Sequence, residues 1–217
     1  MGHGRPLLRG WLHGAAVPFA VAGSGLLWRA VGHLSPLARL PALLYGLAVV
    51  MLFSVSAVYH IPRWWSPAAR ARLLRMDGTA TVLLISGTFV PVAAYTLDGA
   101  WRSWSLAGAL LLTGVGVRLA ATRVATPPRL AAIGYVLAGW LAAIPIWRIA
   151  LVLPRPGIAL IVLGGVVYSL GAAVYALRRP DPSSAWFGYH EVFHVLVTVA
   201  AGLHFTAIWF HVLPLAD

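Results

Sequence analysis

The chain has 217 residues, of which 60% are hydrophobic and 10% charged, and it contains neither cysteine nor lysine. A soluble domain is about one half apolar and about one quarter charged, so this composition excludes an ordinary soluble domain and predicts an integral membrane protein. The 16 basic residues are all arginine, against five acids, and the formal net charge is +11. Because the arginines lie between apolar segments, they indicate membrane topology rather than binding to nucleic acid. Without cysteine there are no disulfides or thiolate sites, so a metal ion must be bound by His, Asp or Glu.

Several apolar segments are long enough to cross a bilayer, which takes about 20 helical residues. The connections between them contain clusters of Pro, Gly and Arg, which are typical of turns. We therefore predict an all-α integral membrane protein that forms a single domain over residues 1–217. Its seven transmembrane helices are expected near residues 14–32, 37–60, 77–97, 103–121, 130–151, 157–177 and 189–211.

The connection between the second and third segments reads PRWWSPAARARLLR. Ser66 is suited to cap a helix that has Pro67 at its first position. Trp64 and Trp65 are suited to the membrane interface, and the arginines to an anionic leaflet. We predict a short amphipathic helix here that lies on the cytoplasmic surface.

The distribution of arginines predicts the orientation of the chain, because cytoplasmic connections carry an excess of basic residues. The N-terminus and the second, fourth and sixth connections hold eleven of them, and the opposite side holds five. We predict a cytoplasmic N-terminus and an external C-terminus, in a cell membrane that is expected to be a bacterial inner membrane. The eleven are Arg5, Arg9, Arg63, Arg70, Arg72, Arg75, Arg118, Arg123, Arg129, Arg178 and Arg179, and the five are Arg29, Arg39, Arg102, Arg148 and Arg155.

Ionisable side chains are costly at membrane depth, so each one is a candidate functional residue. His60 ends the second segment, Asp77 begins the third, and His190 and His194 begin the seventh, so all four reach the same cytoplasmic depth. His190 and His194 are four residues apart and share one helix face. With His60 they provide three nitrogen ligands, which leaves a zinc ion a fourth position for water.

Asp77 and Ser56 are the candidate catalytic residues. Zinc lowers the pKa of its water to about 7. Asp77 could orient or deprotonate that water, and Ser56, one turn before His60, could hydrogen-bond to a metal ligand or to the substrate. As structural alternatives, Asp77 could cap a helix and Ser56 could be a small packing residue. His13 and His33 lie at segment ends and are expected at the membrane interface.

Residues 190–194 also match the pattern H-E-x-x-H, in which two histidines bind zinc and the glutamate is the general base of a metalloprotease. The residues after His194 lack the Gly and His spacing of the metzincins. An intramembrane protease is therefore an alternative function. In the other interpretation, Glu191 faces an arginine or the cytoplasmic rim.

Four stretches of the chain resemble the progestin and adipoQ receptor superfamily, and in particular its hemolysin III branch. They are RGWLH, SVSAVYH, RMDGTATVLLISGTFVP and GYHEVFHVLVTVAAGLHF, and they span essentially the whole chain. The resemblance implies a seven-helix fold with a cytoplasmic-side zinc held by three histidines. It also implies a similarity to alkaline ceramidases, and hence hydrolysis of lipid amides. By motif position the resemblance places His60, His190 and His194 on the metal, Asp77 at its water, and Ser56 as the serine of the S-x-x-x-H element.

We therefore favour a zinc-dependent hydrolase acting on an amide or ester bond of a membrane lipid. The alternatives are a membrane-homeostasis or receptor-like protein with a structural zinc, a cytolytic hemolysin, and the metalloprotease. Membrane lipids are the expected partners. Small residues permit close helix contacts within or between protomers, which leaves a homo-oligomer open. These residues are Gly108, Gly114, Gly164, Gly165 and Gly171.

Overall fold

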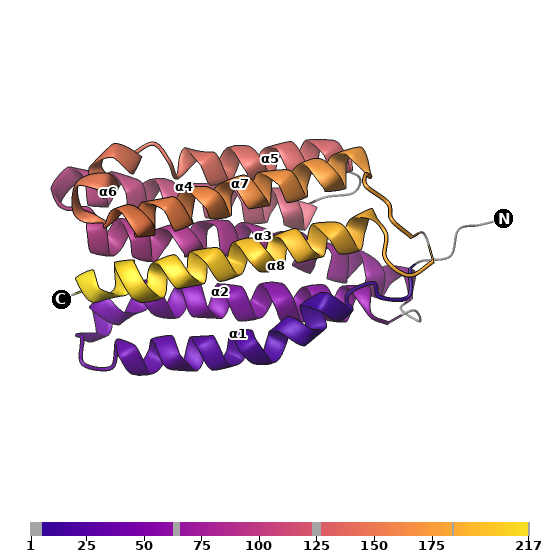
Figure 1. The fold of residues 1–217 in the computed structure, drawn as a ribbon, viewed down its shortest axis with the longest axis horizontal. Helices are drawn as coiled ribbons and strands as arrows, with labels where there is room; N and C mark the ends of the chain where they lie inside the picture. Colours follow the sequence, from indigo (N-terminus) through magenta and orange to yellow (C-terminus); the bar gives the residue numbers. More distant parts are fainter. Residues whose placement is uncertain (1–5, 63–65, 123–126, 184, 217) are drawn as a thin grey trace.

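The computed structural model describes residues 6–62, 66–122, 127–183 and 185–216. Every regular element in these ranges is a helix, and the helices lie side by side along one long axis (Figure 1). This confirms the predicted all-α class. The helices are α1 (Trp11–Ala30), α2 (Pro36–His60), α3 (Pro67–Thr96), α4 (Gly99–Thr122), α5 (Pro128–Leu141), α6 (Ile146–Val152), α7 (Arg155–Leu177) and α8 (Tyr189–Ala207), and α8 continues through a π-helical turn (Ile208–Val212) and a 3-10 turn (Leu213–Leu215).

Five of the described helices are long and apolar enough to cross a membrane, namely α2, α3, α4, α7 and α8 with its terminal turns. A sixth span results if α5 and α6 are counted as one bent helix. The described chain is thus a multi-pass membrane protein with five or six such helices, where the sequence predicts seven. The difference lies at α1, which is not among these helices.

The segment predicted as a separate surface helix is instead the first part of α3. Ser66 caps α3 as predicted, because its Oγ accepts a hydrogen bond from the N–H of Ala69 at 3.2 Å, and Pro67 occupies the first turn. The helix then continues without interruption to Thr96. Residues 68–77 contain neither Pro nor Gly, so nothing in the sequence ends the helix before the membrane segment begins.

The span predicted over residues 130–151 is broken in the structure. α5 ends at Leu141 and α6 begins at Ile146, and the two axes differ by 47°. Pro145 lies between them as the N-cap of α6. Proline has no N–H to donate to the preceding turn and it disfavours helical geometry in the residue before it, which explains the break.

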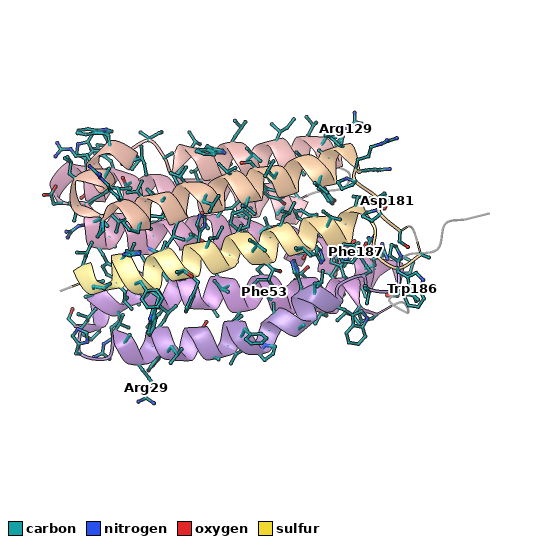
Figure 2. All side chains as sticks on the ribbon, viewed as in Figure 1. Arg29, Phe53, Arg129, Asp181, Trp186 and Phe187 are labelled. Atoms are coloured by element: carbon teal, nitrogen blue, oxygen red, sulfur yellow. The ribbon has the colours of Figure 1, made fainter. Side chains whose placement is uncertain are left out.

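Part of the arginine pattern that predicts the orientation is visible in the structure. Arg129, predicted on the cytoplasmic side, lies toward the end of the bundle at which α8 begins, and Arg29 lies toward the opposite end (Figure 2). Arg5, Arg63 and Arg123 lie outside the described residues, as do Trp64 and Trp65. The orientation relative to a membrane stays a prediction.

The start of the chain and the loop before α8 meet at one end of the bundle. The N–H of Leu7 donates to the carbonyl of Ala185 at 3.0 Å, and the N–H of Leu8 donates to that of Trp186 at 3.2 Å. Trp186 lies at the same end as the start of α8 (Figure 2). α2 ends there as well (Figure 1), so the polar ends of three helices are brought together.

Glycine allows the closest helix contacts in the bundle. A Cβ on Gly87 of α3 would lie 2.9 Å from Cβ of Ala48 in α2. Of the glycines noted in the sequence, Gly164 and Gly171 of α7 lie against side chains of α8. Gly108 of α4, like Gly114, has nothing within 4 Å of an added Cβ. The close contacts of α7 are therefore made within one chain.

We expect Gly87→Ala to destabilise the protein, because α2 and α3 would have to move apart. Overpacking of this kind costs about 1–3 kcal/mol. Gly108→Ala is the matched control, since the added methyl group meets no neighbour and alanine favours the helix by up to about 1 kcal/mol. The measurement is the denaturation midpoint of the detergent-purified protein. Equal midpoints for the two variants would contradict the close α2–α3 contact.

Candidate metal centre

Three histidines that are distant in the sequence meet where α2 ends and α8 begins. His60 is the last residue of α2, and His190 and His194 lie in the first turns of α8. One nitrogen from each ring lies within 4.8 Å of the other two, and all three side chains are buried. Nε2 of His60 is 3.3 Å from Nε2 of His190, and the ring centroid of His194 is 5.0 Å from that of His60. These are the three residues that the sequence predicts as metal ligands.

The spacing of His60 and His190 matches that of two ligands of one tetrahedral cation. Zinc binds imidazole nitrogen at about 2.0–2.1 Å, so two ligating nitrogens in a tetrahedral site are about 3.3–3.4 Å apart. The 3.3 Å between His60 and His190 agrees with that value. A shared proton could also join two rings at this distance, but it would leave the third without a role, and Nδ1 of His194 is buried with no hydrogen-bond partner. A cation held by all three rings accounts for the whole group.

Asp77 and Ser56 lie beside these rings. Oδ2 of Asp77 is 3.8 Å from Nε2 of His60, which is too long for a direct hydrogen bond and places the carboxylate next to the metal position. Asp77 lies inside α3, so its interpretation as a helix N-cap is wrong. Ser56 is 2% exposed, one turn before His60. Both side chains line the same cavity as the histidines.

This cavity has a volume of about 1080 Å³ and extends from the metal centre into the bundle. His204 lines it ten residues beyond His194 on α8, which corresponds to about 15 Å of helix. The polar groups named above lie at one end, and the walls further along are mostly apolar. Among the apolar lining residues are Leu84, Ile85, Phe89, Val136, Ile161 and Ile208.

Comparison with known proteins gives the family of the chain. The model of the family described as haemolysin-III related matches residues 2–205. The chain belongs to this family. It is similar to Hemolysin-3 of Bacillus cereus, with 26% identity over 175 residues that cover 80% of this chain and 75% of the relative. A stretch of 59 residues is 37% identical to the Adiponectin receptor protein of Drosophila melanogaster, and it covers 25% of this chain and 13% of that protein.

In this haemolysin-III related chain, the glutamate of the H-E-x-x-H pattern has a structural role. Glu191 is fully buried. Its Oε1 accepts from Nε of Arg9, and its Oε2 accepts from the N–H of Gly188 at 2.7 Å, which caps α8. This confirms the interpretation in which Glu191 faces an arginine. Both carboxylate oxygens are engaged away from the cavity, so the geometry does not support a metalloprotease base.

α1 also contributes to this centre, which the sequence does not predict. His13, expected at the membrane interface, is 2% exposed. Its ring stacks on that of His194 with centroids 3.8 Å apart, and its Nδ1 is 2.8 Å from Oγ of Ser56. Arg9, which the sequence predicts only as a topology signal, pairs with Glu191. The available signal was the stretch RGWLH, which contains both Arg9 and His13 and carries part of the family resemblance.

Gly10 lets α1 approach the end of α2. It is the N-cap of α1 and has a φ of 85°, a left-handed conformation that glycine adopts without strain. A Cβ at this position would lie 2.6 Å from Cβ of His60 and 3.0 Å from the backbone nitrogen of Ile61. Conformation and space therefore both require glycine next to a candidate metal ligand.

We expect the detergent-purified protein to bind one divalent cation per chain. His194→Ala removes one of three ligands and should abolish binding, because two imidazoles seldom hold zinc alone. His33→Ala, which changes an exposed histidine beyond the other end of α1, should bind as the wild type does. Metal content is measured by mass spectrometry after dialysis. Full metal content in His194→Ala would show that the assignment of ligands is wrong.

Gly10→Ala should weaken metal binding by displacing His60. Loss of a residue that supports a metal ligand typically lowers metal affinity about 10–100-fold. Gly25→Ala on the same helix is the control, because an added Cβ there has nothing within 4 Å. Affinity is read from competition with a chromogenic chelator. The same affinity in both variants would mean that α1 does not support the site.

Proposed function

We propose that this chain is a single seven-span membrane domain, residues 1–217, and that it hydrolyses an amide or ester bond of a membrane lipid at a zinc centre near the cytoplasmic leaflet. The observation that carries the proposal is the position of three histidines, Asp77 and Ser56 at the polar end of a mostly apolar cavity of about 1080 Å³. A lipid bound there would have its acyl chain among apolar side chains and its carbonyl group beside the polar ones.

Zinc bound by the three histidines would polarise the lipid carbonyl and lower the pKa of water to about 7. Proton transfer and stabilisation of the carbonyl oxygen would fall to side chains of the protein. Asp77 would hold the attacking water and accept its proton, and Ser56 would donate a hydrogen bond to the carbonyl oxygen. Water adds to the carbonyl carbon, the C–N or C–O bond breaks, and the proton passes to the leaving amine or alcohol. The products are a fatty acid and an amine or an alcohol.

The cavity would supply binding energy for a lipid chain. Burial of a lipid chain contributes about 0.8 kcal/mol for each CH₂ group. Pockets for drug-sized ligands are about 300–1,000 Å³, so a cavity of about 1080 Å³ accommodates a long acyl chain. Membrane lipids are therefore the partners we propose, and a nucleic-acid partner is not expected. The open faces of Gly108 and Gly114 on α4 are where a homo-oligomer contact would fit.

A second candidate function is a receptor-like or membrane-homeostasis protein in which zinc only joins helices. The observation that favours it is that the histidines come from α2 and α8, so a shared ion would clamp the two helices. A fourth protein ligand would support this structural role. Among the described residues, the group has three candidate ligands. Cytolysis, suggested by the name of the Bacillus relative, is a further alternative that lysis of red cells would test.

The proposed hydrolysis is tested with a panel of fluorescent ceramides and lipid esters. We expect turnover by the purified protein to require metal, and Asp77→Asn to lower kcat about 10²–10⁴-fold while metal content is retained, because a general base contributes that factor. Asp98→Asn, at an exposed position between α3 and α4, should leave turnover unchanged.

Equal and chelator-insensitive rates for the wild type and Asp77→Asn would remove the lipid-hydrolase proposal. Retention of metal with no hydrolysis of any lipid would favour the structural clamp. Cleavage of a peptide that depended on Glu191 would favour the metalloprotease.

A further inference from the structure

His13 is buried against the metal centre without belonging to the group of three ligand nitrogens. One face of its ring stacks on His194, with centroids 3.8 Å apart and ring planes 5° apart. The ring of Phe53 lies nearly perpendicular to it, with centroids 5.1 Å apart and ring planes 84° apart. Its Nδ1 lies 2.8 Å from Oγ of Ser56. The ring is thus held by contacts with three side chains. Two of them, His194 and Ser56, belong to the candidate site.

The stacked contact determines the orientation of the His194 ring plane. The second side-chain torsion of histidine has broad minima, so the backbone of α8 alone does not determine the plane of the ring. A ligating nitrogen must direct its lone pair at the metal, and a ring that turns loses that alignment. The nearly parallel His13 ring, 3.8 Å away, prevents this rotation.

The hydrogen bond determines the direction of the Ser56 hydroxyl. A hydroxyl group rotates freely until it finds a partner. The hydroxyls of Thr81 and Thr88 in α3 donate to carbonyls four residues earlier, as is usual within a helix. Ser56 is paired instead with Nδ1 of His13, a residue from another helix, at 2.8 Å. With Nδ1–H of His13 as the donor, Oγ of Ser56 accepts, so the oxygen is held at the wall of the cavity and its own hydrogen remains available to a substrate carbonyl.

The part of the chain that carries His13 is itself anchored to both helices of the centre. Gly10 lies against His60 at the end of α2, and Arg9 forms an ion pair with Glu191 at the start of α8. The N–H of Leu7 donates to Ala185 in the loop before α8. These contacts are independent of the His13 ring and keep it at a constant distance from its neighbours.

We propose that His13 is a positioning residue of the metal centre, which holds the His194 imidazole in its ligating plane by stacking and the Ser56 hydroxyl in its direction by a hydrogen bond. The role at Ser56 rests on the hydrolytic function proposed above. The role at His194 concerns metal binding alone, so the two can be tested separately.

Two substitutions separate the two roles. His13→Phe keeps a flat ring against His194 and removes the nitrogen that pairs with Ser56. His13→Gln keeps a polar group near Ser56 and removes the stacked ring. His33→Ala is the control, because His33 is exposed and lies beyond the other end of α1. All variants are compared with the wild type for monodisperse elution and denaturation midpoint before metal binding is measured.

The readouts are chelator competition, the visible absorption spectrum of the cobalt-substituted protein, and kcat and KM for the lipid substrate. We expect His13→Gln to lower metal affinity about 10–100-fold and to change the cobalt spectrum. His13→Phe should keep the affinity within about threefold of wild type and the cobalt spectrum unchanged, and should lower kcat about tenfold at constant KM, because Oγ of Ser56 loses its hydrogen bond with His13.

Wild-type affinity and spectrum in both His13 variants would overturn the proposal, and so would the absence of metal from the wild type. Equal loss of metal in His13→Phe and His13→Gln would also overturn it, because a nitrogen of His13 would then be a ligand. If the wild type binds metal but hydrolyses no lipid, the hydrolytic function fails. The affinities and cobalt spectra still decide the role of His13 at His194.

Discussion

The approach of three imidazoles at one end of the helical bundle is the constraint on which the other features depend. His60 and His190 are 130 residues apart in the chain, yet their Nε2 atoms are 3.3 Å apart. Buried polar groups are unfavourable unless each has a partner, and a buried histidine cluster in a membrane domain is a particularly costly arrangement. A shared cation would bind all three rings. It would also join the end of α2 to the start of α8.

The segment that precedes and begins α1 stabilises this arrangement from outside. Arg9 and Glu191 form a largely buried ion pair, and removal of one partner from such a pair commonly costs about 3–5 kcal/mol. Gly10 brings the backbone of α1 against His60, and His13 covers the His194 ring. The acid of the H-E-x-x-H pattern is therefore part of the scaffold. Its neighbours at positions 190 and 194 belong to the metal centre, because successive helical residues point in different directions.

The cavity gives the site its chemical asymmetry. Asp77, Ser56 and the three histidines lie at the end where α8 begins, and Arg70 and Arg75 of α3 line the same end. The walls further along carry aliphatic and aromatic side chains. An amphiphile would fit such a cavity in one direction only, with its polar group near the metal and its chain inside the bundle. The first turns of α3, which begins at Pro67, carry these two arginines.

Much of the architecture is predicted by the sequence alone, because hydropathy and the positions of Pro and Gly are local properties. The helical class, the cap at Ser66 and the grouping of His60 with His190 and His194 were all predicted from segment ends and helical spacing. The break at Pro145, the continuity of α3 and the place of His13 were not. The first two have local causes, a proline inside the predicted span and a stretch at residues 68–77 without Pro or Gly, whereas the place of His13 depends on how helices distant in the sequence pack together. The sequence by itself thus determined which residue types reach one end of the bundle and which family the chain resembles. Only the tertiary structure decided that Glu191 pairs with Arg9 and that His13 lies on His194, because those contacts depend on the relative position of α1 and α8, which no local pattern encodes.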